Sequence, residues 1–184
     1  MELENYIKCY NGGIQTRTIS SLLKFLNNKA LFKPMGVVRG GIRKDIRNAE
    51  GYDFLDNSYS GIHWKNFLKT VIDGYHGQYE KHYQTHATQM ASLEALKYEK
   101  GGKYVVHSDH SGLIPRTMSV ILFLNNDYKG GELNFHDPKD HNKIYKTIKP
   151  KPGRCVLWPS NFLFPHSVSP VTKGKRYTIV SWLI

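Results

Sequence analysis

The sequence predicts an α+β protein that is mostly β, in which N-terminal helices pack on a C-terminal β-barrel or jelly roll. Three observations predict this fold class. The chain has 184 residues, the usual length of one domain with its own core. Its N-terminal half holds two apolar stripes at helical spacing, and its C-terminal half holds short strand-like segments between turns. We therefore expect a single domain over 1–184, with helical support over about 1–92 and a β core over about 93–184.

Two helices are predicted in the N-terminal half. The first would begin at Thr18 as its N-cap. Its apolar residues recur at helical spacing: Ile19, Leu22, Leu23 and Leu26. The second has an apolar stripe from Trp64 to Tyr75, and Gly74 and Gly77 predict its end near Tyr75. Both stripes are expected to face the core.

The strands are predicted by composition. Five segments are short and rich in β-branched or aromatic residues: KYVVHSD, RTMSVILFLN, GELNF, GRCVLWP and RYTIVSWLI. A sixth, LEALKYE, has helical propensity, but its place before KYVVHSD favours a strand. Between the helices lies GVVRGGIRKDIRNAEGYDFLDNSYSG, which we expect to form a strand followed by a mobile loop.

Charge and composition narrow the class of protein. The formal net charge of +11 predicts a basic surface that attracts polyanions, without by itself indicating nucleic-acid binding. Cys9 and Cys155 are too few for a disulfide framework and match no zinc motif. Neither a signal peptide nor a membrane-spanning run is found, so we expect a cytoplasmic protein without a membrane partner. The many Lys, Asn, Tyr and Ile residues favour a bacterial or viral chain, one that could act in a host cytoplasm.

His107 and Asp109 are the first candidate metal ligands. They lie two residues apart on a predicted strand, so their side chains point to the same face. His166 follows the strand-like CVLWP, and if the two strands face each other these residues form a 2-His-1-carboxylate triad. Such a triad suits non-haem Fe(II) oxygenases, although the ligand types also suit zinc. The alternative is a solvated His-Asp pair.

Arg176 favours the metal site over that alternative. Alternation along RYTIVSW places Arg176 on the same face as Thr178 and Trp182. An arginine pointing into a barrel would be a buried cation without a partner, which is costly. A bound dicarboxylate would remove that cost through paired hydrogen bonds, with Thr178 adding a hydroxyl. The alternatives are an ion pair with an internal acid or a position at the rim.

Two long stretches carry a family resemblance: YEKGGKYVVHSDHSGLIPRTMSVILFLNNDYKGGELNFHD and IKPKPGRCVLWPSNFLFPHSVSPVTKGKRYTIVSWL. They resemble the Fe(II)- and 2-oxoglutarate-dependent dioxygenases, in particular the prolyl 4-hydroxylase-like group, from about Leu93 onward. The resemblance implies a double-stranded β-helix of the jelly-roll, cupin-like kind. It also implies Fe(II), 2-oxoglutarate and O2, with ascorbate as a further candidate cofactor. The reaction would hydroxylate a prolyl residue of a peptide or protein and release succinate and CO2.

The resemblance also implies residue roles. Three residues would bind the iron: His107, Asp109 and His166. Three would bind 2-oxoglutarate, with the arginine on its distal carboxylate: Arg176, Thr178 and Tyr98. Three would line the pocket for the target residue: Arg116, Tyr104 and Trp182. The family often has a second tyrosine where this chain has Phe123, so one hydrogen bond to the keto acid is missing, and the aspartate ligand disfavours halogenation.

Other functions stay open. The same iron chemistry could act on a free amino acid or another small molecule, or demethylate nucleic acid. The nucleic-acid branch usually carries an arginine where this chain has Trp182, which disfavours a nucleic-acid partner. A basic binding module on a degenerate barrel would require a broken triad or a lost Arg176. The segment with Arg39, Arg43 and Arg47 is expected to close over an extended peptide, and no oligomeric state is indicated.

The remaining histidines are expected to have no role at the metal. His110 would point to the face opposite Asp109. Three residues lie in FHDPKDHNK, which is expected to be a solvated loop: His136, Asp137 and His141. Three histidines are expected to follow the second helix at the surface: His76, His82 and His86. The glutamate of an H-E-x-x-H zinc motif is absent there.

Overall fold

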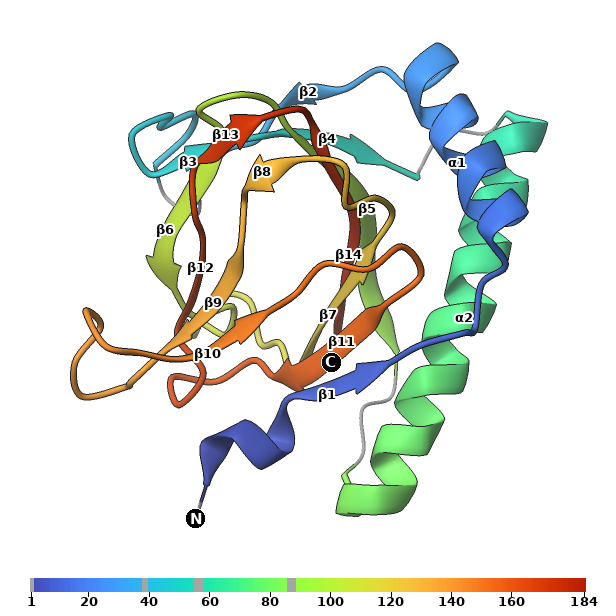
Figure 1. The fold of residues 1–184 in the computed structure, drawn as a ribbon. Helices are drawn as coiled ribbons and strands as arrows, with labels where there is room; N and C mark the ends of the chain where they lie inside the picture. Colours follow the sequence, from blue (N-terminus) through green and yellow to red (C-terminus); the bar gives the residue numbers. More distant parts are fainter. Residues whose placement is uncertain (1, 38–39, 55–57, 86–88) are drawn as a thin grey trace.

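The computed structural model describes residues 2–37, 40–54, 58–85 and 89–184, which form two facing β-sheets with helices against one of them (Figure 1). The mostly β fold confirms the predicted class. The helices are η1 (Leu3–Tyr6), α1 (Thr16–Asn28) and α2 (Tyr59–Tyr83). The strands are β1 (Lys8–Tyr10), β2 (Lys33–Pro34), β3 (Arg47–Asn48), β4 (Glu50–Asp53), β5 (Met90–Tyr98), β6 (Lys103–His107), β7 (Met118–Phe123), β8 (Lys129–Gly130), β9 (Leu133–His136), β10 (Ile144–Ile148), β11 (Cys155–Pro159), β12 (His166–Val168), β13 (Val171–Lys173) and β14 (Arg176–Leu183).

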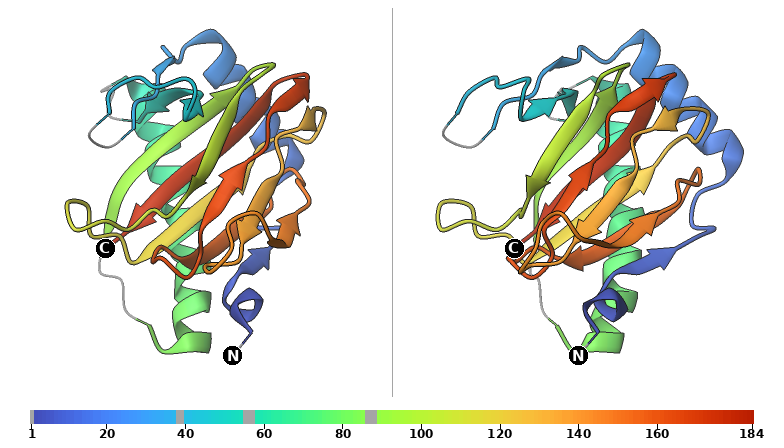
Figure 2. Two further views of the ribbon diagram at one scale, coloured as in Figure 1. Left: turned by 90° about the vertical axis from the view of Figure 1, so that its left-hand side faces the viewer. Right: turned by 60° about the vertical axis from the view of Figure 1, so that its left-hand side comes forward.

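The two sheets differ in size and in what covers them. The larger has the strand order β1-β11-β7-β14-β5-β4-β2, and the smaller has the order β10-β9-β12-β6-β3. The short strands β8 and β13 pair in a separate two-stranded sheet. In both views of Figure 2, α2 lies behind the strands, against the larger sheet. The N-terminal part of the chain contributes β1, β2 and β4 to the larger sheet and β3 to the smaller one. It therefore supplies sheet edges as well as helices.

Strand β14 separates two hydrophobic cores by side-chain alternation. Tyr177 and Ile179 belong to the core between the larger sheet and the helices. Val180 and Trp182 belong to the core between the two sheets. This confirms the predicted alternation along RYTIVSW. The strand prediction for LEALKYE is also confirmed, because β5 pairs with β14 along its length, with Ala95 opposite Ile179.

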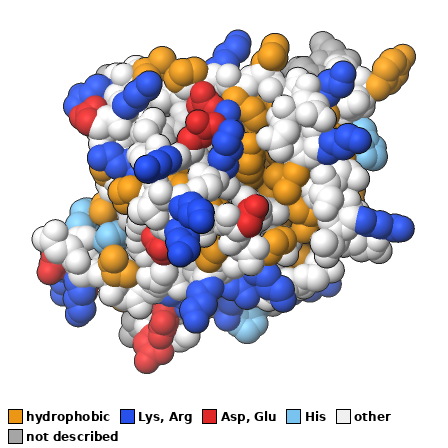
Figure 3. All heavy atoms as spheres, turned by 45° about the horizontal axis from the view of Figure 1, so that its top comes forward, with side chains coloured by type: hydrophobic (Ala, Val, Ile, Leu, Met, Phe, Trp, Pro, Cys, Tyr) orange, Lys and Arg blue, Asp and Glu red, His pale blue; other side chains and the backbone are white. Residues whose placement is uncertain are grey.

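The surface carries the expected basic charge. On the face drawn in Figure 3, Lys and Arg side chains are spread among other side chains rather than gathered into one stripe. Among the described residues, no helix combines the length and apolar character needed to cross a membrane.

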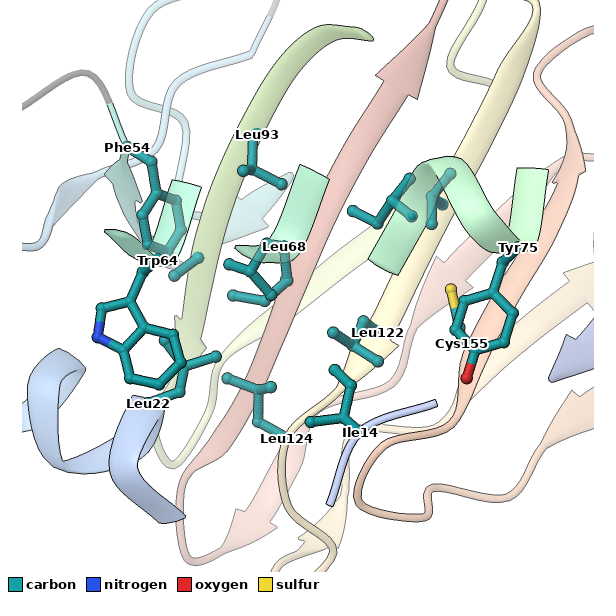
Figure 4. Packing of buried hydrophobic residues seen from close by; sticks show 14 of the residues in the cluster. Ile14, Leu22, Phe54, Trp64, Leu68, Tyr75, Leu93, Leu122, Leu124 and Cys155 are labelled. Carbon is teal, nitrogen blue, oxygen red and sulfur yellow. The ribbon is translucent and has the colours of Figure 1, made fainter. Parts of the chain in front are cut away.

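Helix α1 packs its predicted apolar face on the larger sheet, but it begins earlier than expected. Ile19, Leu22 and Leu26 are buried as predicted, and Leu22 is drawn in Figure 4 with the residues of the helix-side core. The Gln15 carbonyl accepts hydrogen bonds from the amides of Thr18 and Ile19. Thr18 therefore lies in the first turn, and its prediction as the N-cap is wrong.

Helix α2 extends two turns beyond its predicted end. Ser58 caps it by accepting a hydrogen bond from the Gly61 amide, and the helix continues through both predicted stop glycines to Tyr83. A helical glycine costs about 1 kcal/mol relative to alanine. Burial of Tyr75 and Tyr79 outweighs that cost, because removing each aromatic ring from water stabilises the helix by more than a glycine destabilises it. The end predicted near Tyr75 is therefore wrong.

The segment between the helices begins with a turn rather than with the predicted strand. A turn comes first, in which the Val37 amide donates to the Gly41 carbonyl, and the strands β3 and β4 follow it. Arg39 lies outside the described residues. Arg47 lies on β3 opposite Tyr104 of β6, and this register brings its side chain to the pocket described below.

Candidate metal centre

The structure brings His107, Asp109 and His166 together. His107 and His166 are directly opposite each other on the antiparallel strands β6 and β12, and Asp109 follows the end of β6. One potential ligand atom from each residue lies within 4.8 Å of the other two. The Nε2 atoms of His107 and His166 lie 3.6 and 3.4 Å from the two carboxylate oxygens of Asp109. This spacing allows all three side chains to reach one ion.

Backbone carbonyls orient both imidazoles. Nδ1 of His107 lies 2.8 Å from the Val105 carbonyl, and Nδ1 of His166 lies 3.1 Å from the Phe164 carbonyl. A carbonyl can only accept, so each Nδ1 carries the proton and each Nε2 keeps its lone pair. The tautomer and ring orientation of metal-binding histidines are commonly fixed in this way.

Electrostatics keep the cluster in the protonation state that a metal needs. Burial, assisted by the neighbouring His107, lowers the pKa of His166 to about 4, so its imidazole is neutral at pH 7. Burial opposes ionisation of Asp109, but His166, His107 and the Ser119 hydroxyl outweigh it and hold the pKa of that carboxyl below its usual range. A neutral imidazole beside a carboxylate matches a 2-His-1-carboxylate donor set.

Ser119, which is not among the predicted site residues, holds the carboxylate of Asp109 in place. It lies on β7, and its hydroxyl donates to Oδ2 of Asp109 at 2.6 Å. Its oxygen also lies 2.7 Å from the hydroxyl oxygen of Ser160, and both serines are buried. The available signal was a serine inside the otherwise apolar run MSVILF, because a buried hydroxyl needs a partner.

Arg176 lies fully buried at the start of β14, opposite Tyr98 of β5. Its Nη1 donates to the Thr178 hydroxyl at 3.2 Å, while Nε and Nη2 have no partner among the described residues. The guanidinium carbon lies 5.0 Å from the ring centre of Tyr98 and 5.3 Å from that of Phe123. No acidic side chain in the described part of the chain forms an ion pair with it. The arrangement suits a carboxylate ligand, which would accept from the two free nitrogens.

The residues predicted to line a substrate pocket lie beside the cluster. The Arg116 guanidinium lies over the Trp182 ring at 3.8 Å, and its Nη1 lies 3.8 Å from Asp109. The Tyr104 ring stacks on His107 with 3.6 Å between ring centres. Tyr98, Tyr104 and Trp182 line one pocket together with the two histidines and the aspartate of the cluster. The predicted residues are thus contiguous with the cluster.

Arg47, which was expected in a segment closing over a peptide, and Glu94, which was given no role, also interact with this region. Arg47 lines the same pocket and lies over the Tyr104 ring at 4.9 Å. Its Nη1 donates to the Gly36 carbonyl, and its Nε has no partner among the described residues. Burial raises the pKa of Glu94, while the charges of Arg47 and Arg116 oppose that rise. Arg47 comes from β3, which lies outside the region that the resemblance covers.

The remaining histidines lie outside the cluster, and two of them correct the sequence-based expectation. His110 is exposed, with Nδ1 2.9 Å from the Arg116 carbonyl. His136 is not solvated: it is buried on β9, between the His141 carbonyl at 2.6 Å and the Ser167 hydroxyl at 2.8 Å. The turn beyond it, with Asp137 and His141, is more open, as expected.

His76 is the second correction. It lies inside α2 and is buried, 3.7 Å from a carboxylate oxygen of Glu80, because the helix continues past its predicted end. His82 is exposed but also lies within the helix rather than after it, and His86 lies outside the described residues.

Comparisons with known proteins agree with this geometry. The model of the 2OG-Fe(II) oxygenase superfamily matches residues 93–184, half of the chain. Human prolyl 3-hydroxylase 2 is 40% identical over 67 residues, which are 36% of this chain and 9% of that protein. A PKHD-type hydroxylase of Psychrobacter sp. (strain PRwf-1) is 40% identical over 79 residues, 42% of this chain and 28% of the relative. The chain thus spans less than a third of the length of either relative.

Two solved structures share the fold over nearly the whole chain. A Trichoplax adhaerens prolyl hydroxylase in complex with a hypoxia-inducible factor peptide fragment has a TM-score of 0.82 at 20% identity, covering 98% of this chain and 84% of that one. A Pseudomonas putida prolyl-4-hydroxylase has a TM-score of 0.77 at 17% identity, and the match covers 97% of this chain and 92% of that one. Because these likenesses cover nearly the whole chain, the shared fold includes the N-terminal helices as well as the double-stranded β-helix.

Proposed function

Because this chain belongs to the 2OG-Fe(II) oxygenase superfamily, we propose that it is a dioxygenase dependent on Fe(II) and 2-oxoglutarate. Its substrate would be a prolyl residue in a peptide or protein. One observation carries the proposal: a buried guanidinium with two unpartnered nitrogens lies behind Tyr98, which lines the same pocket as a His-Asp-His cluster.

The residues present fit both the metal and the keto acid. His107, Asp109 and His166 would hold Fe(II) from one side and leave its other positions to ligands that the protein does not supply. Arg176, Thr178 and Tyr98 would hold the 2-oxoglutarate carboxylate, which would satisfy the free nitrogens of Arg176. When bound, iron and 2-oxoglutarate supply the oxidation by O2 that hydroxylates a substrate carbon, with succinate and CO2 as co-products.

The chain's own contribution is to bind, orient and exclude water. Ser119 holds the Asp109 carboxylate in one orientation, and the carbonyls of Val105 and Phe164 hold the two imidazoles. The apolar side chains that line the pocket, Leu96 and Val180 among them, keep water away from the metal. A dry and fixed site strengthens every charged contact within it.

A peptide substrate is supported by two arginines beside the cluster. Arg47 and Arg116 each have a buried Nε without an acceptor among the described residues. The carbonyl groups of an extended peptide are acceptors that would satisfy them. Trp182 and Tyr104 add aromatic surface to the pocket lining, and a compact apolar proline ring would pack against it.

The test is a coupled activity measurement on the purified chain. With Fe(II), 2-oxoglutarate and air, we expect peptides that contain proline to raise succinate release and to gain 16 mass units, while the same peptides with alanine in place of proline stay unmodified. Fragment analysis of the product then reports the ring position, for which 4-hydroxyproline is expected. Modification of free amino acids alone would contradict the peptide substrate, and no succinate under any condition would contradict the dioxygenase.

A further inference from the structure

Arg176 is surrounded by Tyr98, Phe123 and Gly131, and this recess holds a second polar group to which the sequence patterns assign no role. Tyr128 lies in the connection between β7 and β8, and its side chain is buried. Gly131, which has a positive φ of 66°, borders the same space. A Cβ at Gly131 would lie 3.0 Å from Cδ of Arg176 and 3.2 Å from Cε2 of Tyr128. Arg176 and Tyr128 are therefore neighbours across one small volume.

The Tyr128 hydroxyl has no acceptor for its proton. It is buried without a hydrogen-bond partner among the described residues, as are Nε and Nη2 of Arg176. A guanidinium offers donors only, so Arg176 cannot accept from the phenol. Burial raises the pKa of Tyr128, with the charge of Arg176 opposing that rise, so the phenol remains protonated at neutral pH. Three donor groups thus lie close together, and the only acceptor among them is the phenol oxygen itself.

Phe123 lacks the hydroxyl that a tyrosine at its position would bring to Arg176, and Tyr128 supplies one from another segment. The Phe123 ring lies on the guanidinium of Arg176 at 5.3 Å, but it brings no hydroxyl into the recess. The hydroxyl comes instead from Tyr128, five positions later in sequence and on a different segment of backbone. The recess therefore has a phenol donor beside the guanidinium although the β7 side chain that faces Arg176 is a phenylalanine.

We propose that Tyr128 is a binding residue for the dicarboxylate cosubstrate, whose distal carboxylate accepts one hydrogen bond from the Tyr128 hydroxyl and others from Arg176. A carboxylate has about four lone-pair positions, enough for the guanidinium and the phenol together. The inference rests on the proposed function, since it concerns the same carboxylate. It adds a residue that supplies the hydrogen bond missing at Phe123.

The test measures binding without turnover. Isothermal titration calorimetry of the Mn(II)-loaded protein in the absence of O2 compares 2-oxoglutarate with pyruvate, a 2-keto acid that lacks the distal carboxylate. We expect Tyr128→Phe to weaken 2-oxoglutarate binding about tenfold, as loss of a hydrogen bond to a charged group does. Pyruvate binding should be unchanged. The control is Tyr145→Phe on β10, which removes another buried hydroxyl without a partner and should leave both affinities unchanged.

The outcomes separate the two proposals. If Tyr128→Phe binds 2-oxoglutarate as tightly as the unaltered protein, the assignment of Tyr128 is overturned and the proposed function stands. If the variant loses affinity for both keto acids equally, Tyr128 acts on the fold of the site and the assignment is again overturned. If the unaltered Mn(II)-loaded protein does not bind 2-oxoglutarate, both proposals are wrong.

Discussion

Replacing Arg176 with methionine is expected to stabilise the metal-free, ligand-free protein while it removes cosubstrate binding. The guanidinium is fully buried, and two of its nitrogens have no partner among the described residues. Methionine matches the arginine side chain as far as Nε and carries no charge, so it would occupy the apolar part of that space without a desolvation cost.

The size of the expected stabilisation follows from the contacts of the Arg176 side chain. A buried ion costs several kcal/mol in lost hydration. The bond to Thr178 returns about 1 kcal/mol, and the contacts with the rings of Tyr98 and Phe123 return about 1 kcal/mol each. A net cost of about 2 kcal/mol remains. For a chain of this size, its removal corresponds to a rise in Tm of about 4–8 °C.

Thermal unfolding with and without 2-oxoglutarate provides the assay. The unaltered Mn(II)-loaded protein should gain about 2.7 kcal/mol at a ligand concentration one hundred times Kd, and Arg176→Met should gain nothing. Arg154→Met is the matched control, because Arg154 donates to Asn11 and to the Lys149 carbonyl near the surface. That variant should melt no higher than the unaltered protein and should keep the ligand-induced shift. A lower Tm for ligand-free Arg176→Met, or a retained shift, would refute this reasoning.

Three further variants test other contacts. Ser119→Ala should weaken Mn(II) binding about 10- to 100-fold in a metal titration, because it frees the Asp109 carboxylate. The control Ser181→Ala removes a hydrogen bond to the Ser92 carbonyl and should leave Mn(II) binding unchanged. Asp109→Ala should abolish succinate release with an unchanged circular dichroism spectrum, and measurable turnover would exclude Asp109 as a ligand. Trp182→Ala should raise KM for a proline peptide about tenfold and leave the Kd of 2-oxoglutarate unchanged, since Trp182 packs on Arg116 beside the cluster. Equal losses in both constants would indicate a general collapse of the pocket.

The parts of the fold that could be predicted are those where a local pattern decides the outcome. Alternation along β14 follows from strand geometry alone, so Arg176 and Trp182 were assigned to one face before their surroundings were known. The same reasoning put His107 and Asp109 on one side of the chain. The likeness to a known family added His166 as the third ligand, because local pattern cannot show that β12 faces β6.

The parts that could not be predicted depend on contacts between distant segments. The end of α2 was missed because the burial of Tyr79 depends on the N-terminal segment, whose Tyr6 carbonyl accepts from its hydroxyl. His136 looked solvated because its partners, the His141 carbonyl and Ser167, meet it only after the sheet forms. Tyr128 was overlooked because it reaches Arg176 from a turn that no motif marks.

The most direct test of the central claim is a crystal structure grown without O2, with Mn(II) and N-oxalylglycine. The account predicts one ion bound by Nε2 of His107, Nε2 of His166 and a carboxylate oxygen of Asp109. It also predicts the distal carboxylate of the inhibitor on the free nitrogens of Arg176. An ion bound elsewhere, or an inhibitor that leaves Arg176 without an acceptor, would contradict it.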